Sequence, residues 1–381
     1  MALCKSSPRF RQLQTLLLGF LILFAAQAAA AQIRTVLVSP VPGDPVASGT
    51  ALRNALAGIS SPSSTNRWLL KIEPGIYDVS ATPLQMRSWV DIEGSGMGVT
   101  TVRGSVQPFA PNKGTVNGAS NAELRLLTVE ATGNSTVTEA VAMYNGGGAS
   151  PRLYRVKLVA QASDGAWGMR NSQSAPLLDE CEITASATAA ASIAYGIEFT
   201  EFEITGQRSS ILRSKIAAAN ATFNYGVTFF TAQTLTEIRD SRIDVTGGTA
   251  TIGIYAHTLS GLWTGQENLV VKNVDISSFG GSSESYGVFL GSGTWVGMDI
   301  SNSKVWGHVS PTTYGIRQQG TAAIILQASS VVGFTKTIDS VSNVSIASTQ
   351  LYGGPVTVAG WLGCMGVWDE GGVFYTNSCP P

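Results

Sequence analysis

A short phrase recurs from the middle of the chain to near its end. It consists of a small or apolar residue, then a charged or polar one, then a branched apolar one. Its copies begin at Val156, Cys181, Ser214, Ser241, Val274, Ser303, Ser329 and Thr349, in steps of 25, 33, 27, 33, 29, 26 and 20 residues. A fixed strand phrase separated by segments of unequal length is typical of a solenoid whose coils carry loops of variable size. This repeat constrains the fold more than any other feature.

The repeat also predicts which side chains share a face. Because strand side chains alternate, the first and third residues of each phrase face inward and the middle one faces outward. The predicted outward row is Lys157, Glu182, Lys215, Arg242, Asp275 and Lys304, and its outward neighbours are Arg155, Glu180, Arg213, Asp240, Asn273 and Asn302. Charge signs largely alternate from coil to coil, which predicts a salt-bridge ladder on a solvated sheet. A substrate groove is the alternative for these rows.

A second phrase runs in parallel with the first and contains a glycine. Its copies are Ala142-Met143, then Gly168, Gly196, Gly226, Gly253, Gly287 and Gly315, each followed by an apolar residue and preceded by Trp167, Tyr195, Tyr225, Ile252, Tyr286 and Tyr314. Two fixed phrases per coil predict at least two sheets. Glycine at a fixed strand position predicts a bend or a close approach of two backbones.

One predicted row of this second sheet contains the candidate site residues. Two residues past the glycine position lie Tyr144, Arg170, Glu198, Thr228, Tyr255, Phe289 and Arg317. Aromatic and arginine side chains on an exposed sheet are able to stack on sugar rings and bond their hydroxyls, so the row is a candidate ligand-binding platform. A covered face is one alternative. A catalytic cleft with Glu198 as acid or base beside Arg170 is another, although glycoside hydrolysis normally needs two carboxylates.

Composition agrees with an all-β solenoid. The 381 residues are 44% hydrophobic and only 13% charged, and they include 42 glycines. Many short strands and turns suit that balance better than helices do. We expect one parallel β-helix of roughly ten coils over residues 67–355, preceded by an N-terminal cap over 32–66 that contains a short helix.

Residues 1–31 have the pattern of a secretory signal peptide. Lys5, Arg9 and Arg11 precede an apolar core over residues 16–24, and an alanine-rich tract follows. A membrane anchor is the alternative, but the small residues favour cleavage, so we expect a secreted protein, extracellular or periplasmic, without membrane insertion. Cleavage removes three basic and no acidic residues, which changes the net charge from −1 to −4. An acidic chain argues against a nucleic-acid partner.

The N-terminal coils have a more specific pattern. Predicted strands cover residues 35–39, 68–72 and 89–92, with a helix over 49–59 that Ser48 caps. The second strand leads into Glu73-Pro74-Gly75-Ile76-Tyr77, and the third ends at Gly94-Ser95-Gly96. Over residues 35–105 this order resembles the pectin-lyase-like right-handed parallel β-helix proteins, with pectin methylesterases nearest in pattern. The resemblance implies a right-handed β-helix and a polysaccharide or cell-surface glycan as partner.

The catalytic motifs of those families are missing. The sequence contains no Asn-Thr-Asp, Asp-Asp, Gly-His-Gly or Arg-Ile-Lys motif of polygalacturonases and no Asp-Phe-Ile-Phe-Gly core of methylesterases. Trp89-Val90-Asp91-Ile92-Glu93 resembles a pectate lyase phrase, but Glu93 stands where that phrase has histidine. The two histidines, His257 and His308, are isolated, and no metal-ligand spacing or cofactor motif is present, so we expect neither metal nor cofactor.

The cysteines predict a locked C-terminus. Cys364 and Cys379 are expected to form a disulfide in an oxidising compartment and to close a cap over residues 356–381. Cys181 falls on the inward small row and is expected to be a buried free thiol, with a reactive thiol as the alternative. The sequence as a whole predicts a non-catalytic protein that binds extracellular polysaccharide or a cell-surface partner. A diverged polysaccharide lyase, glycoside hydrolase or pectin esterase is one alternative, and a structural rod or adhesin segment is another.

Overall fold

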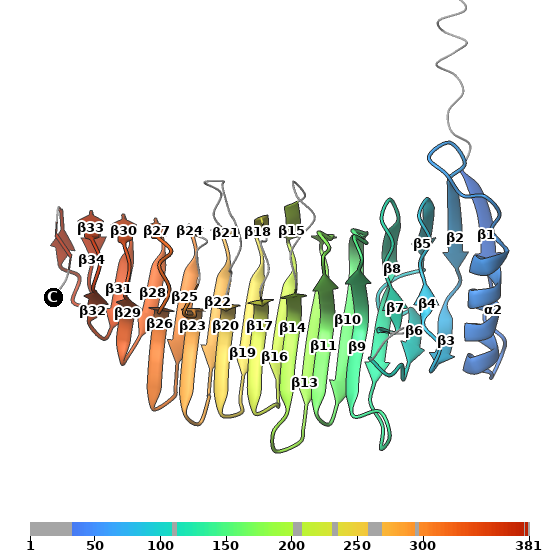
Figure 1. Ribbon diagram of the computed structural model, residues 1–381, viewed down its shortest axis with the longest axis horizontal. Helices are drawn as coiled ribbons and strands as arrows, with labels where there is room; N and C mark the ends of the chain where they lie inside the picture. Colours follow the sequence, from blue (N-terminus) through green and yellow to red (C-terminus); the bar gives the residue numbers. More distant parts are fainter. Residues whose placement is uncertain are drawn as a thin grey trace, which may run out of the picture.

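The coils stack side by side into a rod (Figure 1). The computed structural model describes residues 33–108, 113–200, 208–230, 235–257, 269–293, 297–376 and 378–379, so the predicted signal peptide lies outside the described residues. The strands form one 24-stranded and one 11-stranded sheet. Apart from the last hairpin, their pairings are parallel, and the all-β parallel β-helix is confirmed.

The 11-stranded sheet takes one strand from each coil, so there are eleven coils where about ten were expected. Its strands are β4 (Leu84–Gln85), β7 (Val116–Asn117), β9 (Glu139–Gly146), β11 (Gly165–Ser172), β14 (Ile193–Thr200), β17 (Phe223–Phe230), β20 (Ala250–His257), β23 (Glu284–Leu290), β26 (Thr312–Gln318), β29 (Lys336–Ser340) and β32 (Val356–Val358). Each strand pairs with the next in this order.

The 24-stranded sheet bends at a corner and so forms two sides of the coil. Before the corner lie β1 (Arg34–Val38), β2 (Trp68–Ile72), β5 (Val90–Glu93), β12 (Leu177–Asp179), β15 (Arg208–Leu212), β18 (Leu235–Arg239), β21 (Leu269–Lys272), β24 (Met298–Ser301), β27 (Ile324–Gln327), β30 (Val344–Ala347) and β33 (Leu362–Met365). After it lie β3 (Gly75–Ser80), β6 (Thr100–Gly104), β13 (Glu182–Ala187), β16 (Lys215–Ala219), β19 (Arg242–Thr246), β22 (Asp275–Phe279), β25 (Lys304–His308), β28 (Ser330–Gly333), β31 (Gln350–Gly353), β34 (Val367–Trp368) and β35 (Phe374–Tyr375). The longer β8 (Glu123–Thr132) and β10 (Arg152–Ala162) run along both sides.

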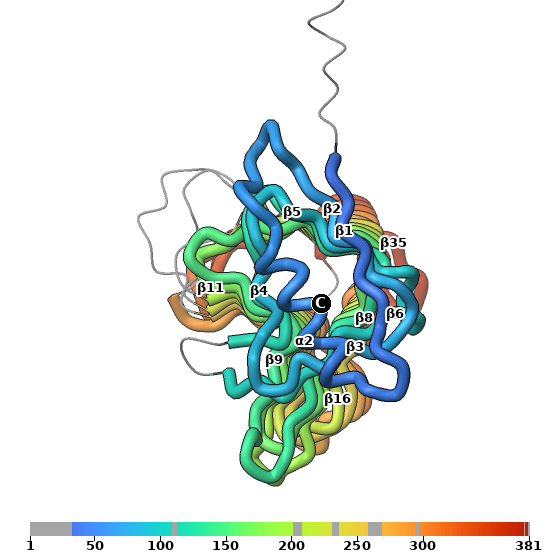
Figure 2. Tube along the Cα trace, turned by 90° about the vertical axis from the view of Figure 1, so that its right-hand side faces the viewer, coloured from blue at the N-terminus to red at the C-terminus, as the bar shows by residue number. Residues whose placement is uncertain are grey.

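The coil is right-handed. Figure 2 looks along the rod from its N-terminal end, and the chain passes clockwise from β2 through β3 and β4 to β5 as it recedes. This is the hand that crossover connections between parallel strands adopt almost without exception.

The register of the first phrase is confirmed. Lys157 pairs with Glu182, Glu182 with Lys215, Lys215 with Arg242, Arg242 with Asp275, and Asp275 with Lys304. The first and third positions of the phrase are buried in the core, while the middle position is partly or fully exposed. The repeat phrase is therefore an accurate marker of register and face.

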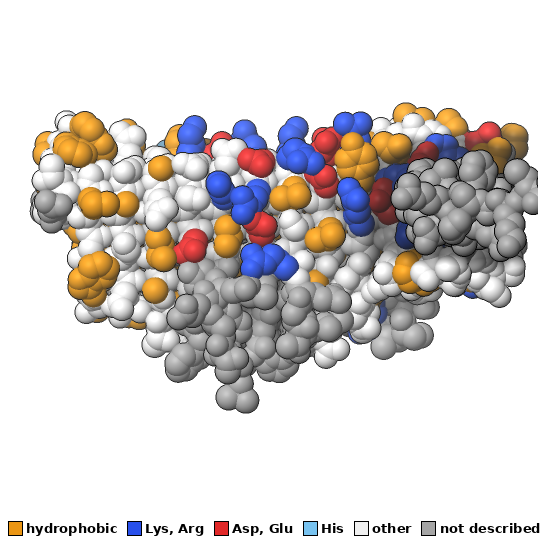
Figure 3. Space-filling model, turned by 90° about the horizontal axis from the view of Figure 1, so that it is seen from above, with side chains coloured by type: hydrophobic (Ala, Val, Ile, Leu, Met, Phe, Trp, Pro, Cys, Tyr) orange, Lys and Arg blue, Asp and Glu red, His pale blue; other side chains and the backbone are white. Residues whose placement is uncertain are grey.

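The neighbouring row differs from the expectation, because it forms the corner instead of a strand. Arg155, Glu180, Arg213, Asp240, Asn273 and Asn302 all have left-handed backbones with φ between 45° and 56°. The ion pairs also lie here: Arg155 Nε is 2.6 Å from Glu180 Oε2, and Arg213 Nη2 is 2.5 Å from Asp179 Oδ2. Within the described residues no ion pair joins neighbouring members of the middle row. These two ion pairs thus lie at the corner, whereas others, such as Arg242–Asp244, lie on a strand. Figure 3 shows basic and acidic side chains interspersed on the face of the rod seen from above.

Buried hydroxyl groups hold the corner. The backbone N–H of Ser214 donates to Ser241 Oγ at 3.1 Å, and that hydroxyl donates to the Arg239 carbonyl at 2.6 Å. The same arrangement recurs at Ser214, Ser303, Ser329 and Thr349. A left-handed conformation is unfavourable for residues other than glycine, asparagine and aspartate, so these bonds compensate a real conformational cost.

The glycine phrase packs directly on the third position of the first phrase. A Cβ atom at Gly168 would lie 2.3 Å from Ile183 Cγ2 and 2.7 Å from the carbonyl oxygen of Gly196. Equivalent contacts occur at Gly196, Gly226, Gly253, Gly287 and Gly315. The predicted close approach of backbones is confirmed, because no side chain fits between the two sheets at this level.

The N-terminal helix begins earlier than predicted. Helix α2 spans Pro45–Gly58, and Asp44 caps it by accepting a hydrogen bond from the Ala47 N–H at 2.9 Å. Ser48, the expected cap, lies inside the helix and is buried. Asp44 is the true cap because Pro45 suits the first helical position, where no N–H is needed. Below the helix, Tyr77 donates its buried hydroxyl hydrogen to the Val38 carbonyl at 3.0 Å.

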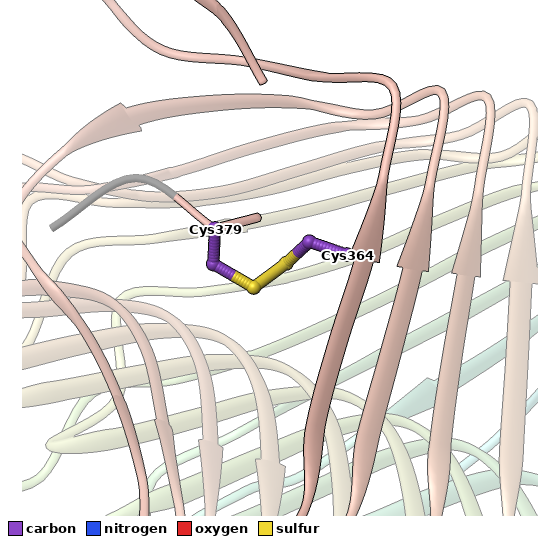
Figure 4. The surroundings of a disulfide bond; sticks show 2 residues. All are labelled: Cys364 and Cys379. Atoms are coloured by element: carbon purple, nitrogen blue, oxygen red, sulfur yellow. A yellow bond between two sulfur atoms is a disulfide. The ribbon is translucent and has the colours of Figure 1, made fainter. Parts of the chain in front are cut away.

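The coils continue further toward the C-terminus than the sequence indicated. Strands β32, β33 and β34 pair with β29, β30 and β31, so the solenoid reaches Trp368 instead of ending near residue 355. Beyond it, β35 pairs antiparallel with β34. The disulfide between Cys364 and Cys379 is confirmed, with a Cα–Cα distance of 5.2 Å (Figure 4). Cys181 is a buried free thiol, as expected.

Candidate functional site

The predicted site row lies on the outer face of the 11-stranded sheet. Strand pairing aligns the row in the predicted order: Tyr144, Arg170, Glu198, Thr228, Tyr255, Phe289 and Arg317. The row continues to Asn117 at one end and to Asp339 at the other. Because equivalent residues repeat every coil, Arg170 and Arg317 are separated by five steps of ~4.8 Å, or roughly 24 Å.

Between these two arginines, aromatic rings stack into a ladder. Trp167 and Tyr195 have ring centroids 5.7 Å apart, and Tyr195 and Tyr225 are 5.0 Å apart. The stack continues through Tyr225–Tyr255, Tyr255–Phe289, Tyr286–Phe289 and Tyr286–Tyr314, at 5.0–5.4 Å. We call these eight residues, Trp167, Tyr195, Tyr225, Tyr255, Phe289, Tyr286, Tyr314 and the flanking Phe230, the aromatic ladder. The ladder combines residues that directly precede the glycines, such as Tyr225, with residues that lie two positions after them, such as Tyr255.

The stacking determines what the ladder presents to a ligand. Neighbouring rings occupy each other's faces, since their planes are within 34° of parallel along the stack. Trp167, Tyr195, Tyr286 and Tyr314 are buried, whereas Tyr225, Phe230, Tyr255 and Phe289 are partly exposed. Few ring faces remain free to stack on a sugar, so the ladder offers a ligand mainly the edges of the partly exposed rings.

At one end of the ladder Arg170 lies between Trp167 and Glu198. Its Nε atom is 2.8 Å from Glu198 Oε2, and its guanidinium carbon lies 5.4 Å from the centre of the Trp167 ring. The Arg170 side chain is 36% exposed, whereas that of Glu198 is 6% exposed. Burial raises the pKa of Glu198 despite the nearby positive charge of Arg170. The sequence therefore placed this pair correctly, but Glu198 is the inner partner.

Glu139 is a second carboxyl in this region, and sequence reasoning missed it. A Cβ atom at Gly165, its neighbour in the sheet, would contact both the Trp167 ring and Glu139 Cγ. Burial raises the pKa of Glu139, and the charge of Asp164 adds to that rise, while Arg170 opposes it. The glycine phrase could have located it, because Glu139 lies three residues before the anchor position at Ala142.

Arg317 ends the ladder on the other side. Its guanidinium carbon lies 4.9 Å from the centre of the Tyr314 ring, and its Nη1 donates to the Tyr286 hydroxyl at 3.0 Å. That hydroxyl in turn donates to Glu284 Oε2 at 2.6 Å. Asp339 lies 3.8 Å from Arg317 Nε and 2.6 Å from the Lys336 ammonium. Arg317 is thus held by one carboxylate and one hydroxyl, with other donors left over.

Two buried polar atoms on this face have no hydrogen-bond partner within the described part of the chain. They are Thr228 Oγ1 and Arg317 Nε. Glu198 lies within reach of two donors, because Arg170 Nε is 2.8 Å from its Oε2 and hydrogen bonding from Trp167 and Arg170 opposes the rise of its pKa. Buried polar groups are nearly always paired, so unpaired ones on one face indicate a place where a ligand or water completes the bonds.

Four tyrosine hydroxyls of the ladder, those of Tyr195, Tyr225, Tyr255 and Tyr286, stay protonated over any physiological pH. Burial raises the pKa of Tyr225 to about 12. Burial also raises the pKa of Tyr195, Tyr255 and Tyr286. These groups therefore act as neutral hydrogen-bond donors and acceptors, not as bases.

The remaining candidates lie at the edges of this face or elsewhere. Tyr144 is held by Lys113, whose ammonium donates to its hydroxyl at 3.0 Å. His257 lies beside the ladder, 5.8 Å from Tyr255 between ring centres. His308 belongs to β25 in the other sheet, so the two histidines do not form one site.

Among the residues the structure describes, no three His, Cys, Asp or Glu side chains come together in a way that would hold a metal ion. The described part of the chain likewise has no helix of the length and apolarity needed to cross a membrane.

Comparisons with known proteins give structural similarities only. No protein-family model matches the chain, and no curated protein matches it. A pectin methylesterase from carrot is similar over 63% of this chain and 82% of its own, with 17% identity and a TM-score of 0.43. The A-module of a mannuronan C-5 epimerase from Azotobacter vinelandii is similar over 84% of this chain and 96% of its own, with 16% identity and a TM-score of 0.38. A pectin methylesterase from Erwinia chrysanthemi covers 84% and 89%, with 10% identity and a TM-score of 0.36. The strand order and hand of the chain itself give the right-handed parallel β-helix that the N-terminal pattern predicted.

Proposed function

We propose that the protein is a secreted, non-catalytic binder of extracellular polysaccharide, and that the outer face of the 11-stranded sheet receives the glycan. The observation that carries this proposal is the alignment of the aromatic ladder between Arg170 and Arg317 on that face, with Thr228 Oγ1 and Arg317 Nε buried and without a partner in the described part of the chain. This alignment along the rod suits a linear ligand that runs across successive coils.

The chemistry of the face favours a sugar chain with carboxylate groups. Each end of the ladder has an arginine, and each arginine uses only part of its five donors on protein partners. Arginine binds carboxylates through paired hydrogen bonds. Tyrosine hydroxyls and ring edges lie between the two arginines and supply contacts for sugar hydroxyls and C–H groups. A chain of several sugars would span the roughly 24 Å between the arginines.

The state of Glu198 argues for binding rather than turnover. A general acid or base must reach the substrate, yet Glu198 is only 4% exposed and is paired with Arg170. Glu198 then serves to position Arg170. Secretion is consistent with the signal pattern of residues 1–31 and with a disulfide, which persists in oxidising compartments.

A diverged polysaccharide lyase, glycoside hydrolase or esterase is the second candidate, and one observation favours it. Glu139 and Glu198 both have raised pKa values near Arg170 and Trp167. Carboxyls with raised pKa values are common in catalytic sites. On this reading Glu139 is the proton-transfer group and Arg170 stabilises developing negative charge.

A screen of polysaccharides separates these functions. Purified protein is tested for binding to pectin, polygalacturonate, alginate and neutral glycans, and each mixture is assayed for new reducing ends, unsaturated products and released methanol. We expect binding to at least one acidic glycan without any product. Product release that Glu139→Gln abolishes would establish the enzyme instead, and absence of binding to every glycan would favour a structural rod or a protein partner.

A further inference from the structure

A second group of aromatic rings lies on the other sheet, away from the aromatic ladder. His308 is at its centre, with ring centroids 5.7 Å from Phe279, 6.3 Å from Trp306 and 5.3 Å from Phe334. Phe279 ends β22, Trp306 and His308 lie on β25, and Phe334 follows β28. We call these four residues the His308 cluster.

Unlike the ladder, the His308 cluster is open to solvent. Phe279 is 45% exposed, Trp306 39% and Phe334 58%. In the register of the sheet, the neighbours of Trp306 on the two adjacent coils are Ser277 and Val332. Neither is aromatic, so within the described residues the Trp306 indole stacks only with the His308 ring of its own strand, and the residue stays 39% exposed.

The sheet does not need aromatic residues at these positions. In the preceding coils the position of Trp306 is occupied by Ser277, Asp244 and Ala217. The position of His308 is occupied by Phe279, Thr246 and Ala219 in the same coils. Apart from Phe279, which belongs to the cluster, these occupants are small or polar, so the strand positions are stable without aromatic rings. Exposed aromatic rings confined to three adjacent coils indicate a contact surface.

Polar groups border the rings. Lys304 lies two residues before Trp306 on the same face of β25, and Asp275 is its neighbour in β22. Neither forms an ion pair with another described residue, so an ammonium and a carboxylate are free to bond a ligand at ~7 Å from the Trp306 position. The N δ1 atom of His308 is buried and also lacks a partner in the described part of the chain.

The backbone next to the cluster is strained. Val309 follows His308 and has a φ of 53°, a left-handed conformation that is a genuine outlier for a β-branched residue. Such strain costs on the order of 1–3 kcal/mol and is found most often at ligand-binding and switch regions. The left-handed Val309 ends strand β25 directly after His308 and so fixes the position of the His308 ring.

We infer that the His308 cluster is a second glycan-binding site, which stacks the apolar face of a sugar ring on Trp306 and bonds the ring's hydroxyls through Lys304 and Asp275. A pyranose has an apolar face and a polar rim, and the cluster presents an aromatic surface with charged groups at its border. A neutral or weakly charged sugar suits it best, because Lys304 and Asp275 cancel in charge. Since it lies on a different sheet, the site is independent of the ladder face.

The test uses the full-length secreted chain and three insoluble probes: cellulose, chitin and a cross-linked pectin gel. Trp306→Ala is expected to weaken binding to a probe by about tenfold, the equivalent of one lost stacking contact, and Phe334→Ala several-fold. Trp361→Ala is the matched control, because this exposed tryptophan lies at the C-terminal end, away from the cluster. Thermal unfolding of each variant shows whether it is folded, and Trp306→Phe should restore much of the binding.

Each site is tested in the absence of the other. In an Arg170→Ala, Arg317→Ala background, binding that persists and is then lost with Trp306→Ala supports the second site even where the ladder-face proposal fails. Unchanged binding by folded Trp306→Ala, or no binding of the parent chain to any probe, overturns it. A Trp306→Ala variant that loses binding to lipid vesicles but keeps binding to glycans would also overturn the proposal, in favour of a membrane contact.

Discussion

The Nε atom of Arg170 lies 2.8 Å from Oε2 of Glu198, its direct neighbour in the next coil. The two residues occupy the same strand position in successive coils, so their contact is a property of the register. One partner is buried and the other is half-exposed, which turns the guanidinium outward and leaves its free donors toward solvent. This pair places a fixed cation at one end of the ladder face.

The raised pKa of Glu198 makes stability depend on pH in a defined direction. In the folded state Glu198 keeps its proton above pH 4.5, the ordinary pKa of a glutamate side chain. This contributes stability to the folded state that is fully present below pH 4.5 and is lost as the pH rises toward the folded-state pKa. Glu198→Gln removes this contribution. We expect the unfolding free energy of the wild type, minus that of the variant, to fall as pH rises above about 4.5.

Urea unfolding of both proteins across this pH range measures the difference. At pH 4 the two proteins should differ by no more than about 1 kcal/mol, because both side chains are then neutral. Glu139→Gln should show a trend of the same sign, since burial raises the pKa of Glu139 as well. A difference that stays constant or rises with pH would mean that Glu198 is fully ionised in the folded protein.

The glycine contacts between the sheets predict a large cost for a single methyl group. In Gly226→Ala the new Cβ would meet Ile243 Cγ2 at 2.3 Å and the Gly253 carbonyl oxygen at 2.5 Å. Overpacking of this kind should lower the unfolding free energy by about 3 kcal/mol. Gly58→Ala is the matched control, because nothing lies within 4 Å of its new Cβ and the change should be neutral or slightly stabilising. Equal effects of the two changes on denaturant unfolding would refute the packing account.

The hydroxyl row predicts that the corner weakens when one serine loses its oxygen. Ser241→Ala leaves the Ser214 N–H without an acceptor and should cost about 1–3 kcal/mol. Ser60→Ala, on an exposed turn, should stay within ~0.5 kcal/mol of the wild type. Amide hydrogen exchange would locate the effect, with faster exchange expected at the Ser214 N–H. Unchanged exchange at that amide would show that the hydroxyl does not hold the corner.

The disulfide should stabilise the last coil. Replacing Cys364 and Cys379 by serine frees a loop of about 15 residues and should lower the unfolding free energy by about 3 kcal/mol if the rod unfolds as one unit. If the end unfolds alone, hydrogen exchange of β33 and β34 should accelerate while β17 stays protected. If β33 and β34 exchange equally fast in the disulfide-bonded protein and in the serine variant, then their pairing with β30 and β31 already holds the last coil in place.

The sequence allowed the register to be predicted because a strand has a period of two and the interior is dry. In the predicted register Lys157 pairs with Glu182, and the residues on either side of each face inward. A shift of one strand by one residue would turn these apolar residues toward solvent. The same logic placed Arg170 beside Glu198. The signal of a buried row is strong because every coil repeats it.

The parts that sequence reasoning did not reach depend on side-chain contacts between coils. Arg155 and Glu180 give no local sign of a left-handed backbone, since groups that hold the corner, such as the Ser214 hydroxyl that accepts from the Cys181 N–H, belong to the next coil. Asp339 lies in a coil where Thr337 takes the place of the glycine. The glycine pattern in the sequence therefore ended one coil before Asp339. Whether Tyr195 stacks on Tyr225 or on a sugar depends on rotamers, which the sequence does not specify.

Isothermal titration with the acidic glycan that binds most tightly in the screen tests the central claim most directly. Arg170→Ala and Arg317→Ala should each weaken binding about tenfold or more, because each removes charge-assisted hydrogen bonds worth about 1.5–3 kcal/mol. Lys215→Ala, on the exposed middle row of the other sheet, should bind as the wild type does. Folded arginine variants with wild-type affinity, or a loss in Lys215→Ala equal to theirs, would contradict the assignment of the glycan to the ladder face.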